Sequence, residues 1–266
     1  MLWFLDLCFR LRGRYEKRYL GEDCGWVKDL PFGLIIKFGK MRTGSEADTL
    51  RYIRKHTTIP VPRVYASAEK DGRHYTLMKC IDGIPLECVW DDLTSQQRSH
   101  IVSQLHDYVA QLRTLKPPPT IPPGSISSLY GKPYLDARLS SGHPVGPFLS
   151  EAAFNDFLID VASKWIHPEL TVGTRRRMRD DHRIVFTHGD LAPRNILVKG
   201  GKVVALIDWE ESGWMPEHWE LVKAMWFPAM GPDSTWNEAI FDFITREHEN
   251  DWKVDRELSD YMVGAI

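Results

Sequence analysis

The sequence has little cysteine, no long apolar run and no excess of charge of one sign. Its four cysteines form no Cys-x-x-Cys pair, and nothing in the sequence suggests secretion. We therefore expect reduced thiols in an intracellular protein. The net charge is -2 with both signs interspersed, so no nucleic acid or anionic membrane is indicated as a partner. The apolar stretch 1–11 is interrupted by Asp6 and Arg10 and is too short to span a bilayer. We therefore expect a cytoplasmic protein.

Three polar residues with the chemistry of phosphoryl transfer follow a short apolar strand at 184–187. His188 and a glycine break this strand into a loop that carries Asp190, and Asn195 and Asp208 follow five and then thirteen residues later. Phosphoryl transfer to a hydroxyl uses one carboxylate to orient and deprotonate the hydroxyl, and two oxygen ligands for the Mg2+ that bridges the ATP phosphates. The set therefore predicts a kinase.

A predicted β-hairpin brings two of these residues together. The β-branched runs 196–198 and 203–207 flank Lys199-Gly-Gly-Lys202. Glycine adopts positive φ without steric cost, so this tetrapeptide predicts a two-residue turn. Pairing of the two strands returns Asp208 to the side of Asn195, where two oxygen ligands meet at one hard-cation site.

Simpler interpretations of the three residues exist. Asp190 is in the context of a turn, Asn195 is in a position to cap a strand or turn, and Asp208 is able to solvate a loop. A metallohydrolase using His188 with the two aspartates is the rival chemistry. No His-x-x-x-His spacing elsewhere completes a dinuclear centre, and coincidence of all three residues around one hairpin is improbable, so the kinase interpretation is favoured.

The same stretch resembles a known superfamily. The pattern is His-Gly-Asp-Leu-x-x-x-Asn-Ile-Leu-Val at 188–198, followed by Ile-Asp-Trp-Glu at 207–210. It is similar to that of the aminoglycoside phosphotransferase and choline kinase superfamily. Phe-Thr-His-Gly-Asp-Leu-Ala-Pro-Arg-Asn and Trp-Glu-x-x-Gly-Trp-x-Pro-Glu resemble its large fungal branch. The resemblance covers about residues 30–230 and is almost silent on the acceptor.

The resemblance implies an α+β, two-lobed, protein-kinase-like fold and ATP-dependent phosphorylation of a small-molecule hydroxyl. It implies Asp190 as the catalytic base, and Asn195 and Asp208 as the Mg2+ ligands. His188 would brace the catalytic loop, and Arg194 in the same motif is placed with the catalytic residues. We expect residues 1–82 to form a small antiparallel-sheet lobe and 83–266 a mainly helical lobe.

Lys37 and Glu46 are the candidates for the phosphate clamp. In the apolar run 34–38, Lys37 and Ile35 lie on the face opposite to the other three residues. Such a lysine is either an edge residue that reaches water or a phosphate ligand. By resemblance, Lys37 would contact the α- and β-phosphates and pair with Glu46. Thr43-Gly-Ser-Glu46 is also a capping box, so helix capping alone is an alternative role for the glutamate.

A strand predicted at 74–78 is followed by Lys79, Cys80 and Ile81. In the superfamily such a segment is the hinge whose backbone groups hold adenine. Backbone recognition leaves no side-chain signature, so from the residues alone this is a strand that ends in a turn.

The phosphate-covering loop is the weakest feature of the pattern. Kinases place a glycine-rich turn between their first two strands, because only glycine lets backbone N–H groups approach the phosphates closely. The only candidate is Gly21-Glu-Asp-Cys-Gly25, whose two acids would oppose a triphosphate. This leaves room for a shortened first lobe or for reduced affinity for ATP.

The second lobe is expected to begin with a long helix. Thr94-Ser-Gln-Gln97 is a capping box, and the prolines from 117 end the helix. Its apolar stripe, assigned to core packing, is Ile101, Leu105, Tyr108, Leu112 and Leu115.

Three further segments concern the acceptor. The Gly-, Ser- and Pro-rich stretch 124–149 is either a surface excursion or part of the acceptor wall. Pro216 is expected to begin a helix that continues over 217–226, which leaves at most eight residues after Asp208. Protein kinases need a longer segment to present a peptide, so a small acceptor is favoured. The tryptophans after Asp208 either pack in the core or form an acceptor pocket that binds a cation.

These observations predict an ATP- and Mg2+-dependent phosphotransferase that acts on a hydroxyl of a small molecule. The alternative is a nucleotide-binding pseudokinase that acts as a scaffold or regulator, for which the poor glycine loop is the motive. Aminoglycoside, choline, amino-alcohol and secondary-metabolite acceptors remain open, as does the oligomeric state.

Overall fold

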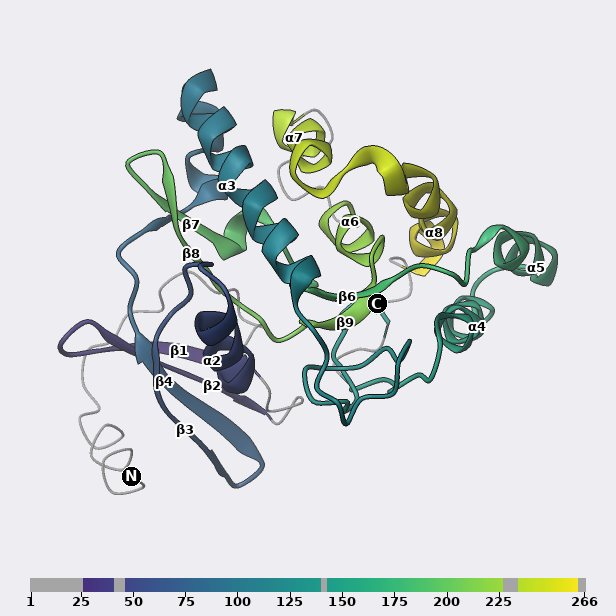
Figure 1. The fold of residues 1–266 in the computed structure, drawn as a ribbon, viewed down its shortest axis with the longest axis horizontal. Helices are drawn as coiled ribbons and strands as arrows, with labels where there is room; N and C mark the ends of the chain where they lie inside the picture. Colours follow the sequence, from purple (N-terminus) through teal and green to yellow (C-terminus); the bar gives the residue numbers. More distant parts are fainter. Residues whose placement is uncertain (1–25, 41–45, 140–142, 227–233, 263–266) are drawn as a thin grey trace.

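The computed structural model describes residues 26–40, 46–139, 143–226 and 234–262. Within these residues the chain forms one lobe built on a four-stranded antiparallel sheet and one mainly helical lobe (Figure 1). The predicted α+β class is confirmed. The apolar stretch 1–11, the candidate phosphate loop 21–25 and the start of the capping box at Thr43 lie outside the described residues.

The sheet of the first lobe follows the order β1-β2-β4-β3. Its strands are β1 (Trp26–Leu30), β2 (Leu34–Lys40), β3 (Val64–Lys70) and β4 (Arg73–Lys79). Asp71 and Gly72 join β3 to β4 with φ of 53° and 66°, the positive values that a two-residue hairpin turn requires. The strand predicted at 74–78 is therefore confirmed as β4.

Helix α2 (Glu46–His56) lies against this sheet (Figure 1). Ala47, Leu50 and Ile53 are buried while Arg54 is exposed, as the predicted amphipathic spacing requires. Packing of this face fixes the first turn of α2, and with it Glu46, beside β2.

The second lobe begins with short elements and the long helix α3 (Ser95–Thr114). The short elements are β5 (Ile84–Pro85), η1 (Leu86–Cys88) and η2 (Trp90–Asp92). Thr94 and Gln97 form the predicted capping box at the start of α3. The predicted stripe is buried from Ile101 to Leu112, so its assignment to core packing is confirmed.

Two small sheets carry the loop with the His-Gly-Asp motif. One sheet has the order β5-β7-β8, with β7 at Ile196–Lys199 and β8 at Lys202–Leu206. The other pairs β6 (Ile184–Thr187) with β9 (Gly213–Pro216), and the 3-10 helix η3 (Pro193–Asn195) precedes β7. The predicted β7–β8 hairpin is confirmed, with Gly200 and Gly201 at φ of 59° and 73°. Ile207 N donates to Asn195 O at 3.0 Å, so the pairing returns Asp208 to the side of Asn195.

The helix predicted to start at Pro216 begins later than expected. Pro216 is the last residue of β9, where it pairs with Ile184 of β6, and α6 spans Trp219–Ala224. Long-range strand pairing overrides the local preference of proline for the first helical position. The segment between Asp208 and α6 is thus 209–218, longer than predicted, and part of it is a strand.

The remaining helices surround the second lobe (Figure 1). They are α4 (Glu151–Ala162), α5 (Pro168–Arg177), α7 (Thr235–Ile244), η4 (Arg246–His248) and α8 (Glu249–Met262). Trp209, Trp214, Trp219 and Trp236 are fully buried, so these four pack the core. One apolar cluster extends from Leu50 of α2 to the residues around α3 and α7, which holds the lobes together; the boundary between 82 and 83 stays a prediction. None of the described helices is long and apolar enough to cross a membrane.

Candidate active site

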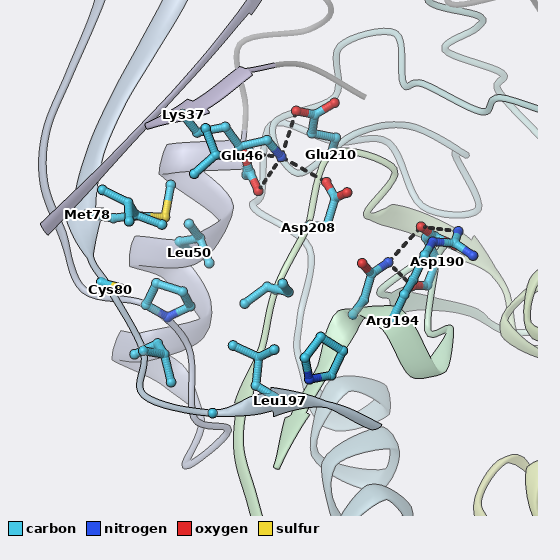
Figure 2. Close-up of a pocket in the computed structure, with 18 of the residues that line it drawn as sticks. Lys37, Glu46, Leu50, Met78, Cys80, Asp190, Arg194, Leu197, Asp208 and Glu210 are labelled. Atoms are coloured by element: carbon cyan, nitrogen blue, oxygen red, sulfur yellow. Dashed lines mark hydrogen bonds and ion pairs between the residues drawn. The ribbon is translucent and has the colours of Figure 1, made fainter. Parts of the chain in front are cut away.

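Lys37 lies among three carboxylates at the junction of the two lobes (Figure 2). Its Nζ is 3.0 Å from Glu46 Oε2, 2.9 Å from Asp208 Oδ1 and 2.9 Å from Glu210 Oε1. We call these four residues the Lys37 centre. The structure thus brings together three residues that the sequence singled out. It adds Glu210, whose only signal in the sequence is its place two residues after Asp208 in the same motif.

The Lys37 centre contains more acid than one ammonium neutralises. Burial alone would lower the pKa of Lys37, but the surrounding carboxylates outweigh burial and raise it well above its ordinary value. Burial raises the pKa of Glu46 to about 7 despite the attraction of Lys37. Burial would also raise the pKa of Asp208, but the attraction of Lys37 outweighs burial and lowers this pKa. The centre therefore keeps a surplus of negative charge.

The backbone at Asp208 is held in an unusual conformation. Asp208 has φ of 63°, in the left-handed region that a residue with a Cβ adopts only at a cost. It directly follows the hairpin, whose bond from Ile207 N to Asn195 O fixes its start, and Trp209 N donates to Glu46 Oε1 at 3.3 Å just beyond it. Such strain persists only where neighbouring bonds hold it, and it is concentrated at functional sites.

Asp190 is oriented by two residues of its own loop. Arg194 Nη2 donates to both of its carboxylate oxygens, at 2.7 and 2.8 Å. Asn195 Nδ2 donates to Asp190 Oδ2 at 2.7 Å and to Asp190 O at 2.9 Å. The carboxylate is thus fixed in position, and its arginine partner remains half exposed at 44 %.

The buried ring of His188 holds this loop in place. Its Nδ1 accepts from Asp190 N at 3.2 Å, and its Nε2 faces Ile207 O at 3.1 Å, which identifies Nε2 as the protonated nitrogen. Burial lowers the pKa of His188, in keeping with a neutral ring. The bracing role implied by the family resemblance thus has a geometric basis, because this ring ties the Asp190 loop to the end of β8.

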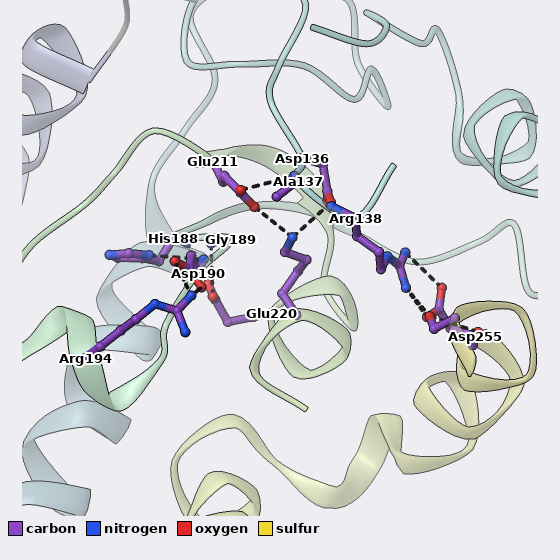
Figure 3. A network of polar contacts seen from close by, with 12 residues as sticks. Asp136, Ala137, Arg138, His188, Gly189, Asp190, Arg194, Glu211, Glu220 and Asp255 are labelled. Atoms are coloured by element: carbon purple, nitrogen blue, oxygen red, sulfur yellow. Dashed lines mark hydrogen bonds and ion pairs between the residues drawn. The ribbon is translucent and has the colours of Figure 1, made fainter. Parts of the chain in front are cut away.

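Glu220 anchors the backbone of the same loop (Figure 3). Its carboxylate accepts from His188 N at 2.6 Å and from Gly189 N at 3.1 Å. The side chain is 2 % exposed, so it does not face solvent, and burial raises its pKa to about 7. Gly189 has φ of 79°, and a Cβ there would lie 2.1 Å from Glu211 O, so only glycine fits.

A cavity of about 420 Å³ unites the predicted site residues (Figure 2). All of them line it except His188, which lies beneath the loop. Its charged end is formed by the Lys37 centre with Asp190, Arg194 and Asn195. Its apolar end includes Ile35, Leu50, Met78 and Leu197. The apolar end thus suits a flat apolar ring. The charged end suits a polar group that binds together with a cation.

The expected hinge lines the apolar end with Lys79, Cys80 and Ile81. Lys79 N donates to Arg63 O at 2.9 Å, and Cys80 N donates to Gly33 O at 2.8 Å. Among the described residues, Ile81 N has no such partner.

The loop 124–149 forms a wall of the cavity through Leu135 and Ala137. Ala137 N donates to Glu211 Oε1 at 3.1 Å, so this loop is tied to the segment after Asp208 (Figure 3). Of the two roles that the sequence left open, the structure therefore supports a wall of the site for this part of the loop.

Lys223 of α6 supports that wall. Its Nζ lies 2.9 Å from Asp136 Oδ1 and 2.7 Å from Glu211 Oε2. We call these three residues the Lys223 centre. Its residues are brought together from three segments distant in sequence, and none of them carried a signal that sequence reasoning could use.

The comparisons with known proteins agree with this architecture. The family model described as the phosphotransferase enzyme family matches residues 40–258. No curated protein sequence matches the chain significantly. The resemblance noted in the sequence is thus supported at the level of the superfamily, while the resemblance to its fungal branch stays a prediction.

Solved structures with the same fold are low in sequence identity. Aminoglycoside phosphotransferase APH(2'')-Ib with bound ADP has a TM-score of 0.64 at 10 % identity, over 94 % of this chain and 84 % of that chain. APH(3'')-Id from Streptomyces rimosus has 0.59 at 16 % identity, over 97 % and 98 %. A protein from Haemophilus somnus, provisionally assigned as a fructosamine-3-kinase, has 0.60 at 17 % identity, over 94 % and 82 %. The likeness confirms the predicted protein-kinase-like fold.

Proposed function

The chain belongs to the phosphotransferase enzyme family, and from this premise we propose that it transfers the γ-phosphate of ATP to a hydroxyl of a small molecule, with Mg2+. One observation carries the proposal: Lys37, Asp208, Asn195 and Asp190 line the charged end of one cavity whose other end is apolar. Catalysis of this transfer consists mostly of positioning and charge neutralisation, which a preformed cavity of this kind supplies.

The apolar end would hold adenine and Lys37 the phosphates. Ile35, Met78 and Leu197 offer apolar surface to a purine ring, and Ile81 N would donate to a ring nitrogen. Lys37 would exchange part of its contact with the carboxylates for the α- and β-phosphates, while Glu46 keeps its side chain in place. Similar structures contain ADP, or ATP with streptomycin, which supports an adenine nucleotide as the ligand of this cavity.

The oxygen donors of the site fit Mg2+. Three carboxylates share one ammonium in the Lys37 centre, which leaves the surplus negative charge that a hard divalent cation neutralises. Asn195 donates through Nδ2 to Asp190, so its carbonyl oxygen is the atom left for a cation. Asp208 and Asn195 would hold the ion, with Glu210 beside them. When bound, Mg2+ neutralises the charge that develops on the phosphates.

Asp190 would orient the acceptor hydroxyl and take its proton. A carboxylate has about four acceptor positions, of which Arg194 and Asn195 use three, so one position stays available to a hydroxyl in the cavity. The hydroxyl oxygen then forms the new bond to the γ-phosphorus, ADP leaves with the bridging oxygen, and Asp190 holds the proton. Arg194 keeps the carboxylate in the productive orientation.

A small acceptor fits the segments around Asp190. The loop 124–149 and Glu211 close the wall beside it, and the segment 209–218 turns into a strand of the core instead of extending to hold a peptide. Similar structures contain gentamicin or hygromycin B, which supports a small polyhydroxylated molecule as the acceptor class.

A nucleotide-binding protein that transfers no phosphate is the second candidate. The observation in its favour is that Arg194 already contacts both oxygens of Asp190. This candidate predicts binding of Mg2+ and ATP without consumption of ATP by any acceptor. Release of ADP in the presence of an acceptor would rule it out.

Thermal unfolding with and without Mg2+ and ATP tests the nucleotide site first. A ligand at 100 times its dissociation constant adds about 2.7 kcal/mol to the folded state, which raises the melting temperature by several degrees. We expect this rise to require Mg2+, to vanish in Asp208→Ala, and to persist in Asp160→Ala, an exposed aspartate of α4. No rise in the wild type at millimolar ATP, or an equal rise in Asp208→Ala, would reject the proposed site.

A further inference from the structure

A second polar cluster lies outside the cavity, where the segment that enters β6 meets the C-terminal helices. His182 precedes β6, His248 is the last residue of η4, Asp251 lies in the first turn of α8, and Glu151 begins α4. His182 and His248 are 8 % and 3 % exposed, and Glu151 is 3 % exposed. None of these residues lines the cavity of the candidate active site.

Three of these side chains, His182, His248 and Asp251, bring possible ligand atoms close together. His182 Nε2 lies 3.2 Å from Asp251 Oδ2, and His248 Nδ1 lies 3.5 Å from the same oxygen. The three atoms all lie within 4.8 Å of one another. Ligands bound at about 2.0–2.1 Å in a tetrahedron are about 3.3 Å apart, so the two spacings to Asp251 Oδ2 are close to those around a zinc ion.

Apart from their closeness to Asp251 Oδ2, the two ring nitrogens have no hydrogen-bond partner among the described residues. Neither His182 Nε2 nor His248 Nδ1 forms a hydrogen bond with a described residue, although both are buried. His182 Nε2 is close to Asp251 but outside hydrogen-bond geometry. Buried polar atoms almost always have a partner, because leaving one without a partner costs its hydration. A bound ion would supply the partner that both nitrogens lack.

Glu151 prepares His182 for this role. The carboxylate is 2.7 Å from His182 Nδ1 and also accepts from His182 N at 2.8 Å. A carboxylate on one nitrogen fixes the proton there and turns the lone pair of the other nitrogen outward. Histidine ligands of metals are commonly held in this way by a carboxylate or a carbonyl.

We propose that His182, His248 and Asp251 bind one divalent transition-metal ion, with Zn2+ as the best fit, and that Glu151 orients His182. Two imidazoles and one carboxylate suit zinc, and His248 and Asp251 have the i, i+3 spacing that places both on one side of a helical segment. The ion joins α8 to the segment that leads through β6 into the Asp190 loop. Its role is to hold this junction, and it is independent of the proposed phosphoryl transfer.

A neighbouring group of ligand atoms fits an ion less well. Glu151, His182 and His218 also lie within 4.8 Å of one another. Their shortest spacing, 2.7 Å between Glu151 Oε1 and His182 Nδ1, is a hydrogen-bond distance and too short for two ligands of one tetrahedral ion. This group therefore serves the orientation of His182.

The competing explanation is a protonated His182 between two carboxylates. Burial lowers its pKa, but Asp251 and Glu151 outweigh burial and raise the pKa to about 9. In that case the cluster is an internal ion pair that needs no metal. Direct measurement of zinc binding separates the two explanations, because an imidazolium has no lone pair to offer.

The experiment is a zinc titration of the full-length chain after removal of metals with a chelator. Binding is followed by competition with a chromogenic chelator, and melting temperatures are recorded with and without zinc. Co2+ in place of zinc reports tetrahedral coordination through its visible absorption. The variants are His248→Gln and Asp251→Asn, which keep side-chain size, together with Glu151→Gln. His106→Gln, an exposed histidine of α3, is the matched control, and Asp208→Ala removes cation binding in the cavity.

We expect one equivalent of zinc in the wild type, in His106→Gln and in Asp208→Ala. The melting temperature should rise by about 5–10 °C at 100 times the dissociation constant. His248→Gln and Asp251→Asn should lose this equivalent while circular dichroism shows them folded, and Glu151→Gln should bind about 10–100-fold more weakly. Absence of saturable binding at micromolar zinc, or equal binding by folded His248→Gln and Asp251→Asn, would overturn the proposal.

Discussion

The Lys37 centre and the Lys223 centre are built from the same parts and differ in where their charge is directed. Each surrounds a buried lysine with carboxylates at hydrogen-bond distance. The Lys223 side chain is 2 % exposed, and its aspartate partner is 1 % exposed. Lys37 is 10 % exposed and lines a cavity with three acids that are more open. In the Lys223 centre only Glu211, which is 19 % exposed, reaches the cavity, while the lysine and Asp136 are closed off from it. In the Lys37 centre the lysine and all three acids line the cavity, so this centre is the one open to a ligand.

The glutamates of the two centres extend the comparison. Burial raises the pKa of Glu46 to about 7 in one centre and that of Glu211 to about 7 in the other, in each case against the attraction of the lysine. Both centres therefore carry a group that titrates near neutral pH. Only in the Lys37 centre would a bound cation take over the neutralisation.

Loss of the Lys223 ammonium should give the largest change in stability. Lys223→Met leaves Asp136 buried without its cation, and breaking a buried pair from one side costs about 3–5 kcal/mol. Urea unfolding monitored by circular dichroism measures this loss. The double variant Lys223→Met/Asp136→Asn should recover part of it, because the uncompensated charge is gone. If the free energy of unfolding of Lys223→Met lies within about 1 kcal/mol of the wild-type value on the same urea curves, the contrast between the two centres is lost.

Loss of the Lys37 ammonium should instead act mainly on turnover. Lys37→Met removes a donor to the phosphates, and loss of one such preorganised group costs about 10²–10³-fold in rate. Its cost in stability should be smaller than that of Lys223→Met, since the carboxylates left behind are 12–34 % exposed whereas Asp136 is 1 % exposed. Steady-state release of ADP and urea unfolding are measured on the same preparations. Full activity of Lys37→Met would contradict its assignment to the phosphates.

The pH dependence of stability should reveal both glutamates. Each has its pKa raised from 4.5 to about 7 in the folded state, so between these values the folded protein binds more protons than the unfolded chain. Stability should therefore fall as pH rises from 4.5 through 7, by about 1–3 kcal/mol for each group, and Glu220, whose pKa burial also raises to about 7, should contribute in the same direction. Urea unfolding across this range should show a flatter slope in Glu46→Gln and in Glu211→Gln. Glu69→Gln, which changes an exposed glutamate of β3, is the control. If Glu46 and Glu211 made stability rise with pH through this window, their pKa values would not be raised in the folded state.

The smallest effect is expected for a surface pair next to the hinge. Lys199 Nζ lies 2.6 Å from Asp82 Oδ2, but the two side chains are 62 % and 89 % exposed. Such pairs contribute about 0.2–1 kcal/mol because solvent and salt screen them. Lys199→Ala should therefore leave urea unfolding nearly unchanged, and salt should reduce any difference further. A loss as large as that of Lys223→Met would mean that proximity, not burial, governs these pairs.

The parts of the fold that were predictable depend on local sequence. The β7–β8 hairpin follows from two consecutive glycines, and its closure explains why Asn195 and Asp208 meet. The helix predicted over 217–226 is present as α6, but its predicted start at Pro216 was wrong, because Pro216 belongs to β9. The partner of β9 is β6, about 30 residues away, and no local pattern shows that pairing.

The same distinction applies to the sites. Asp190, Asn195 and Asp208 lie within one motif, and Lys37 was singled out by its place in a strand ahead of the helix that carries Glu46, together with the family resemblance. Asp136, Glu211 and Lys223, like His182, His248 and Asp251, meet only through tertiary packing. Single residues of these types, scattered in a sequence, are usually surface residues, and their chemistry becomes visible only once burial and distance are known.

Release of ADP in the presence of a panel of small hydroxyl compounds tests the central claim most directly. The wild type, with Mg2+ and ATP, should release ADP in a manner that depends on at least one acceptor. Asp190→Ala should keep the thermal shift with Mg2+ and ATP and lose about 10²–10⁴-fold in acceptor-dependent rate, since general base catalysis contributes that much. Acceptor-dependent release by Asp190→Ala at the wild-type rate would contradict the assignment of Asp190 as the base of a phosphotransferase.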